Sequence, residues 1–232
     1  MTPAYDGSHL PADPAAPLPS LQPGQDFALP LVQDGVGVTL EAGETLYHQG
    51  DAARHSYLVT SGLLALSLDG AGSRGRLLDL AGPGDVVGAL SPSQERYLDT
   101  ASALGPDVRI VALPFDAQGS GTYDGVLGHA AAARLERLTE QLQDVDVPVA
   151  VRVAKVFLRL ARRFGQEVQG GMVRLTLPLT HDTLAGLVGA ARETTSSAVQ
   201  QLRDLGLIAG TRGRYVVLPH AVQRFAEDSA VN

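Results

Sequence analysis

The chain has 232 residues, of which 44% are hydrophobic, and it contains no cysteine. This length suits two domains of modest size, and the composition is typical of a globular protein. The lack of cysteine excludes disulfides, iron–sulfur ligation and cysteine nucleophiles, and it fits a cytoplasmic protein. No apolar run reaches the roughly 18 residues that a membrane helix needs.

The charge is unevenly distributed along the chain. The net charge of −7 opposes nucleic-acid binding, but residues 149–232 carry eleven Arg and Lys against six Asp and Glu. Residues 1–148 carry seven against nineteen. A nucleic acid would attract the C-terminal part and repel the rest. The alternative is an ordinary solvated surface, because an excess of five charges is modest.

The N-terminal half begins with a proline-rich segment. Residues 1–30 lack the basic start and the apolar centre of a signal peptide, so we expect a flexible tail. Residues 31–122 contain short apolar segments separated by glycines, which is typical of a small barrel or jelly roll. Five glycines should occupy turns that need a positive φ or a close backbone approach: Gly43, Gly50, Gly62, Gly84 and Gly88.

A long helix is predicted within residues 123–147, from about Asp124 to Val145. Five apolar residues on it step by four, three, four and three, the seam spacing of a two-stranded coiled coil: Ala131, Leu135, Leu138, Leu142 and Val145. An amphipathic helix packed on its own domain is the alternative. Pro148 should end the helix and form the hinge to a domain over residues 148–232.

Residues 180–205 have the spacing of a helix-turn-helix. Thr180 can cap the first helix, and Gly189 permits the left-handed backbone of a sharp turn. A second helix follows from about Arg192. Four of its residues fall at intervals of three and four and should be buried, leaving a polar face that could enter a DNA groove: Thr195, Ala198, Val199 and Leu202. A helical hairpin in a protein core could show the same bare pattern.

Longer motifs carry a resemblance to a known family. "LVGAARET" followed by "LRDLGLI" resembles the C-terminal domain of the cyclic-AMP receptor protein and fumarate-nitrate regulator (Crp-Fnr) superfamily of bacterial transcription factors. "AGETLYHQGD" followed by "YLVTSGLLAL" resembles the cyclic-nucleotide-binding β-roll of the same superfamily. The resemblance covers about residues 34–218. It implies an α+β protein with an N-terminal β-roll (jelly roll), a long dimerisation helix and a C-terminal winged helix-turn-helix. It also implies a homodimer that binds double-stranded DNA and RNA polymerase.

The resemblance gives roles to residues of the second helix. Arg192 should donate to guanine O6 and N7, and Glu193 should accept from cytosine N4. Thr180 and Thr194, near helix starts, are expected to bind phosphate. Two such helices in a dimer read major-groove faces about 34 Å apart, so the operator should be an inverted repeat. Pairing of Arg192 and Glu193 with neighbouring side chains is the alternative.

Other positions of this domain refine the DNA site. Arg212 and Arg214 lie in a turn that resembles a wing touching the DNA backbone. Ser196 and Ser197 belong to the polar face, but many family members carry an arginine at position 197, so base preference there should differ or relax. Ala191 stands where a serine is common, which removes a helix cap or phosphate donor.

The effector site departs from the family pattern. Cyclic-nucleotide binders of the family hold the phosphate with a glycine-flanked segment followed by an Arg-Ser or Arg-Thr pair. Here the segment from Gly84 to Gly88 keeps the glycines but carries Asp85 in place of glutamate. Arg96 does not match the expected arginine cleanly, and alignment of the strands puts Leu98 there. Without a fixed guanidinium, a buried phosphate would keep an uncompensated charge. We expect weak or absent cyclic-AMP dependence.

The remaining effector options are no stronger. Arg137 and Leu138 stand near where small hydroxyl residues would face adenine. Haem would need an axial ligand, and scattered histidines are usually structural: His48, His55 and His129. We therefore expect no cofactor and no metal, with constitutive DNA binding or an unidentified effector. A cyclic-AMP-responsive activator of the same family is the alternative.

An enzyme is disfavoured by the sequence. There is no G-x-S-x-G motif, and the histidines lack zinc-ligand spacing. A ligand-binding module acting on protein partners would explain the β-roll, but it would leave the second helix of the helix-turn-helix without a role.

Overall fold

The computed structural model describes residues 36–229 except 70–75, 92, 114–120 and 212. The contacts divide the chain into two compact units, residues 1–138 and 139–232. This division lies inside a helix, earlier than the boundary after residue 147 that the sequence predicts. The predicted tail over residues 1–30 lies outside the described residues.

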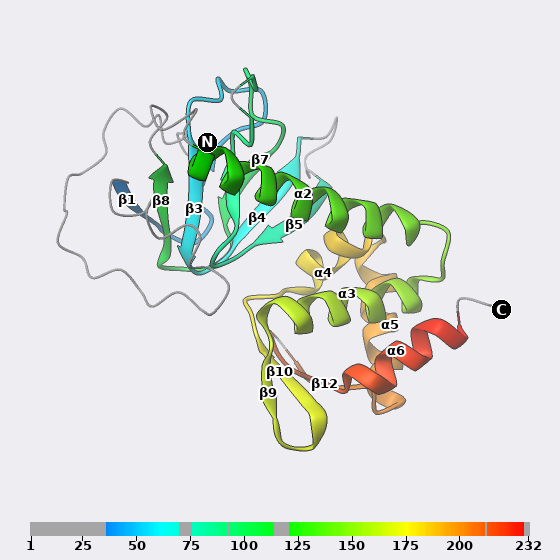
Figure 1. Ribbon diagram of the computed structural model, residues 1–232. Helices are drawn as coiled ribbons and strands as arrows, with labels where there is room; N and C mark the ends of the chain where they lie inside the picture. Colours follow the sequence, from blue (N-terminus) through cyan, green and yellow to red (C-terminus); the bar gives the residue numbers. More distant parts are fainter. Residues whose placement is uncertain (1–35, 70–75, 92, 114–120, 212, 230–232) are drawn as a thin grey trace. The chain divides into compact units, whose positions relative to one another are not determined.

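The first unit is built on two antiparallel four-stranded sheets (Figure 1). In spatial order, one sheet contains β1 (Val36–Leu40), β8 (Val108–Leu113), β3 (Ser56–Ser61) and β6 (Val86–Gly88). The other contains β2 (Thr45–Tyr47), β7 (Thr100–Ala103), β4 (Leu64–Leu68) and β5 (Arg76–Ala81). The two sheets confirm the predicted β-roll.

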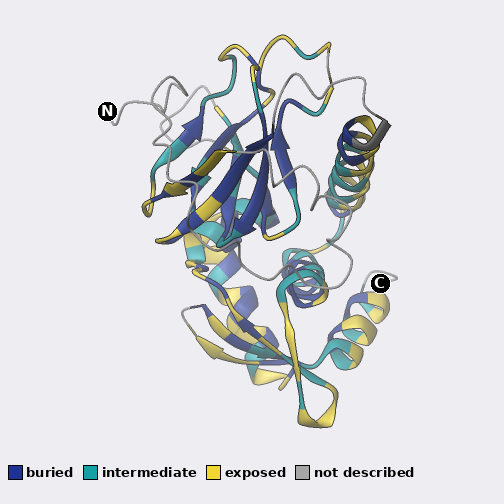
Figure 2. Ribbon diagram, turned by 60° about the vertical axis from the view of Figure 1, so that its left-hand side comes forward, coloured by how far each residue is buried: buried dark blue, intermediate teal, exposed yellow. Residues whose placement is uncertain are grey.

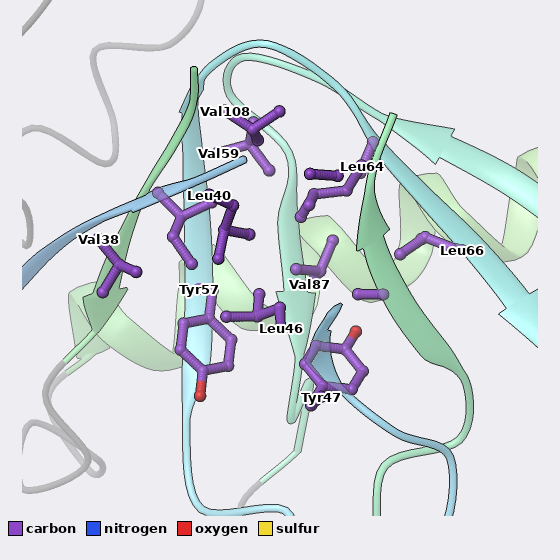
Figure 3. Packing of buried hydrophobic residues seen from close by; sticks show 14 of the residues in the cluster. Val38, Leu40, Leu46, Tyr47, Tyr57, Val59, Leu64, Leu66, Val87 and Val108 are labelled. Atoms are coloured by element: carbon purple, nitrogen blue, oxygen red, sulfur yellow. The ribbon is translucent and has the colours of Figure 1, made fainter. Parts of the chain in front are cut away.

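The inward side chains of both sheets form the core of this unit. Aliphatic residues fill it together with the rings of Tyr47 and Tyr57 (Figure 3), and the strands are largely buried (Figure 2). All five glycines singled out in the sequence have a positive φ. At Gly88 a side chain is disfavoured for a second reason, because a Cβ atom would lie 2.7 Å from the carbonyl oxygen of His55.

Helix α2 (Gly121–Gln143) follows the β-roll. It begins three residues before the predicted Asp124 and ends two before the predicted Val145. Its first turns pack on the roll, where Tyr123, Val126 and Leu127 join a cluster with residues of β3, β6 and β8. This part of α2 is an amphipathic helix on its own domain, as the alternative interpretation expects.

The second unit combines helices with a small antiparallel sheet. The helices are α3 (Val149–Phe164), α4 (His181–Val188), α5 (Arg192–Asp204) and α6 (Pro219–Asp228). The sheet has the order β11 (Ile208–Thr211), β12 (Arg214–Val217), β10 (Met172–Thr176) and β9 (Gln166–Val168), and a short 3-10 helix, η3 (Gln169–Gly171), connects β9 to β10. Helix α3 is the centre of the unit: it packs against α4, α5 and α6, and its Phe157 meets the ring of Tyr215 edge-on at 5.0 Å.

No helix in the described part of the chain is both long and apolar enough to cross a bilayer.

Candidate nucleic-acid interface and sensor site

Helices α4 and α5 are joined by a sharp turn at Gly189. Helix α4 begins after Thr180, whose hydroxyl accepts a hydrogen bond of 3.0 Å from the amide of Thr183. Gly189 ends it in the left-handed conformation, with φ of +67°. Both features agree with the sequence interpretation. The hydroxyl of Thr180, predicted to contact phosphate, is exposed and already serves as the cap of its own helix.

Helix α5 presents one buried and one exposed face. It begins at Arg192, as the sequence predicts, and Ala191 before it supplies no side-chain cap. The four residues of the predicted stripe are buried. The predicted DNA-contacting residues Arg192, Glu193, Thr194 and Ser197 are exposed.

Arg192 has an acidic neighbour that the sequence interpretation missed. Its Nη1 lies 3.7 Å from Oδ2 of Asp182 on α4, and about 60% of each side chain is exposed. An exposed pair of this kind contributes little to stability. It does place a carboxylate next to the guanidinium of Arg192.

The two serines of α5 differ in their availability. Ser196 is half-buried, and its hydroxyl lies 2.7 Å from Nδ1 of His181, so it links α5 to the start of α4. The hydroxyl of Ser197 donates to the carbonyl of Glu193 at 3.0 Å. Ser196 therefore has a structural partner, whereas the exposed Ser197 can rotate away from its own helix.

Strands β11 and β12 form the predicted wing. Arg214 is exposed on β12, while Arg212 lies outside the described residues. Arg203 of α5 donates from Nε to the carbonyl of Gly210 at 3.0 Å, and its guanidinium lies over the ring of Tyr215. Arg203 thus connects the second helix to the wing, a role that its place in the basic segment does not reveal.

Arg152 supports the helix-turn-helix from α3. Its Nη1 donates to the carbonyls of Val188 and Gly189, at 3.3 and 3.5 Å. The last carbonyls of a helix have no partner within the helix and favour a cation nearby. The contact spans 36 residues, so only the fold could identify it.

The predicted effector segment forms a tight turn in the β-roll. The carboxylate of Asp85 accepts from the amide of Gly82 at 2.7 Å, and the amide of Gly84 donates to Val59. Arg137 of α2 reaches this turn, with Nη2 3.8 Å from Oδ1 of Asp85. The structure thereby brings together Asp85 and Arg137, two of the candidate effector residues.

Arg96 does not join them. It is exposed, and its Nη1 donates to the carbonyl of Gly50 at 2.6 Å. Leu98 is also exposed. The buried residues of this segment are Tyr97 and Asp99. A carboxylate, and not a guanidinium, therefore points into the roll here.

Two buried ion pairs connect the roll to α2. Arg134 binds the carboxylate of Asp99, whose other oxygen accepts from the hydroxyl of Tyr47 at 2.9 Å. Arg137 donates from Nε to Asp79 at 2.7 Å. We call these residues, together with Asp85, the roll–helix network. Sequence reasoning identified Arg137 and Asp85 but missed the other four.

Tyr47 is the neutral member of the roll–helix network. Burial and the neighbouring Asp99 raise the pKa of Tyr47 well above its ordinary value, so its hydroxyl stays protonated and donates. The same oxygen accepts from the amide of Gly88 at 3.0 Å. Burial lowers and Asp99 raises the pKa of Arg134, and the net direction is upward. Each of the two buried carboxylates, Asp79 and Asp99, therefore has an arginine partner.

The predicted dimer seam is partly exposed. Leu135 and Leu142 are 67% and 68% exposed, and Ala131 and Leu138 are half-buried. Val145, 51% exposed, follows the end of α2 and lies in a turn. Four of the five seam residues therefore lie on the helix.

A two-sheet roll with a helix and a winged helix-turn-helix define a transcription regulator with a sensor-type domain. Residues 37–117 match the family model described as cyclic nucleotide-binding domain. Residues 151–222 match the Crp-like helix-turn-helix domain. Among the described residues, no group of three or more His, Asp or Glu could hold a metal ion.

Similar proteins and solved structures agree with these two family matches. The chain is 34% identical to the CRP-like cAMP-activated global transcriptional regulator of Mycobacterium tuberculosis over 179 residues, covering 74% of this chain and 79% of that protein. It is 29% identical to the cyclic AMP receptor protein of Thermus thermophilus, over 72% of this chain and 76% of that one. The FixK2 structure from Bradyrhizobium japonicum aligns with a TM-score of 0.71 at 21% identity, covering 82% of this chain and 96% of that chain. The chain belongs to the Crp-Fnr superfamily of transcription regulators.

Proposed function

We propose that this regulator is a homodimer that reads an inverted-repeat operator through the exposed face of α5, with Arg192 and Glu193 as the base-reading residues. The observation that carries the proposal is the orientation of α5: its apolar stripe is buried, and Arg192, Glu193 and Thr194 are exposed at its start. The start of a recognition helix is the part that contacts base edges in helix-turn-helix proteins.

Dimer formation is supported by the exposed apolar residues at the end of α2. Leu142 follows the seam spacing on α2, and both Leu142 and Val145, in the turn after the helix, are more than half exposed. A second copy of the chain would bury them, and two copies related by a two-fold axis would place two recognition helices on one face of a duplex. Contact with RNA polymerase follows from the same family assignment and belongs to the proposal.

A salt series tests the DNA-binding part. Sequence-specific binding should appear in a gel-shift assay at low salt and weaken steeply as salt rises, because each neutralised phosphate releases counterions. Absence of binding at low salt would favour a module that acts on protein partners.

We further propose that DNA binding does not require cyclic AMP. Among the described residues, the roll–helix network sets three carboxylates against two guanidiniums. A cyclic nucleotide would add a phosphate to a region whose cations already have anionic partners, and the one exposed candidate, Arg96, is bound to Gly50. A buried anion without a dedicated cation is strongly disfavoured.

The alternative is a cyclic-AMP-responsive activator, which the Mycobacterium relative's description as cAMP-activated favours. Isothermal titration of the purified protein with cyclic AMP separates the two. We expect no heat of binding at micromolar concentrations. Micromolar binding accompanied by tighter operator affinity would establish the alternative.

A further inference from the structure

A buried carboxylate lies where α2 ends. Asp144 directly follows α2, and its side chain is 6% exposed, while the next two residues, Val145 and Asp146, are exposed. Its Oδ1 accepts from Nζ of Lys155 and its Oδ2 from Nη1 of Arg159, both at 2.6 Å. Both oxygens of the carboxylate are therefore held by cations.

The two cations belong to one face of α3. Positions 155 and 159 are four residues apart, so their side chains lie side by side on the helix. Charge-assisted bonds are stronger than neutral ones, and removal of one partner of a buried pair is strongly destabilising. Asp144 consequently fixes the turn after α2 to α3.

Helix α3 in turn supports the helix-turn-helix, α4 and α5. It packs against α4 and α5, and its Arg152 binds the turn between them. Leu142 and Val145 stand on either side of Asp144, and all of these residues belong to the compact unit 139–232. Leu142, Val145 and the recognition helix α5 thus belong to the same compact unit. Asp144 connects the first two to α3, on which α5 packs.

We propose that Asp144 is a positioning residue for operator reading. It holds Leu142 and Val145 in place relative to α5, and in the homodimer this fixes the distance and rotation between the two recognition helices. The inference rests on the proposed function, because it needs a dimer that reads two half-sites. The preference of the dimer for one spacing between half-sites would then depend on a buried carboxylate that lies away from the DNA-reading face.

The test compares Asp144→Asn with Asp146→Asn on a series of duplexes. Asparagine has nearly the same shape, but it has no charge, and an NH2 donor replaces one of the two oxygens that accept from the cations. Asp146 is exposed in the same turn, so its variant is matched in lost charge. The duplexes carry the operator selected by the wild-type protein, that operator with one base pair inserted or removed between half-sites, and a version with one half-site scrambled.

Wild type and Asp146→Asn should prefer the native spacing by about tenfold or more, as expected for two rigidly spaced recognition helices. In Asp144→Asn the preference for the native spacing should fall to about threefold or less. The affinity for the single half-site should change by less than about twofold, because helices α4 and α5 are unaltered. Melting curves show whether each variant is folded. Lys155→Met, which leaves Arg159 on Asp144, should give an intermediate spacing preference and serves if Asp144→Asn does not fold.

An unchanged spacing preference in Asp144→Asn would overturn the inference. An equal loss on full and half operators would also overturn it, because Asp144 would then only stabilise the reading domain. Wild-type protein that bound full and half operators equally would instead overturn the homodimer proposal, and the inference with it.

Discussion

Arg192 is the residue on which base reading depends in the proposed function. It is the first residue of α5 and is largely exposed, with Asp182 as its neighbour. Because a bidentate arginine contact carries about 1–3 kcal/mol of discrimination, Arg192→Ala should lose about that much at the cognate operator and relax the preference at one base pair of each half-site. Competition binding with single-base operator variants measures both effects.

Arg214→Ala is the control for lost charge. Arg214 is exposed on the wing, where a phosphate contact would be independent of sequence. Its loss should weaken all duplexes about equally. A specificity ratio that Arg192→Ala left unchanged would show that other residues read the bases.

Tyr47 is the residue that tests the roll–helix network. Tyr47→Phe removes the donor to Asp99 and the acceptor for the amide of Gly88. Oδ1 of Asp99 and the amide of Gly88 then each lose a buried hydrogen bond, so we expect a loss of about 1–3 kcal/mol in unfolding free energy. Urea denaturation measures it.

Tyr97→Phe is matched to this variant, because the ring of Tyr97 stacks on Tyr47, whereas its hydroxyl bonds the backbone of His55, at 3.2 and 3.3 Å, and not a carboxylate among the described residues. The loss there should be smaller. Equal losses of unfolding free energy in both variants would mean that the hydrogen bond from Tyr47 to Asp99 adds no particular stability.

At the scale of elements, α2 has two different parts. Its first turns bury Tyr123, Val126 and Leu127 on the roll, whereas Leu142 near its end is 68% exposed. Leu142→Glu should shift the protein toward monomers in sedimentation equilibrium, because a carboxylate would be desolvated in the seam.

Leu98→Glu supplies the comparison for α2. Leu98 is also 68% exposed but lies in the β-roll segment before β7. This variant should keep the oligomeric state of the wild type. If both variants remained dimeric, the interface would lie elsewhere.

The elements also show which features a sequence can reveal. The positive φ of Gly43 and Gly189 and the buried stripe of α5 depend on local chemistry, and they were predictable. The binding of Asp99 by Arg134 joins residues 35 apart, and that of Arg152 to Val188 spans 36. Such pairs depend on which strands and helices become neighbours. Residue spacing contains no signal for them.

At the scale of the whole molecule, the charge count predicted the position of the DNA-binding domain but not the partners of its basic residues. The C-terminal excess of basic residues correctly indicated a DNA-binding domain. Several of those residues have internal roles, however: Lys155 and Arg159 bind Asp144, and Arg203 binds the wing. Fewer cations are therefore available to phosphates than the eleven in the composition. The salt dependence of DNA binding should be steep, but shallower than eleven phosphate contacts would give.

We propose a whole molecule in which a DNA reader of two-fold symmetry is joined to a β-roll domain whose Arg134 and Arg137 are bound by carboxylates of the same domain. Selection of binding sites from random duplexes by the purified protein, without cyclic AMP, tests this most directly. We predict enrichment of an inverted repeat whose half-sites are about one helical turn, or 34 Å, apart. No enrichment until cyclic AMP is added, or enrichment of a motif without two-fold symmetry, would contradict the account.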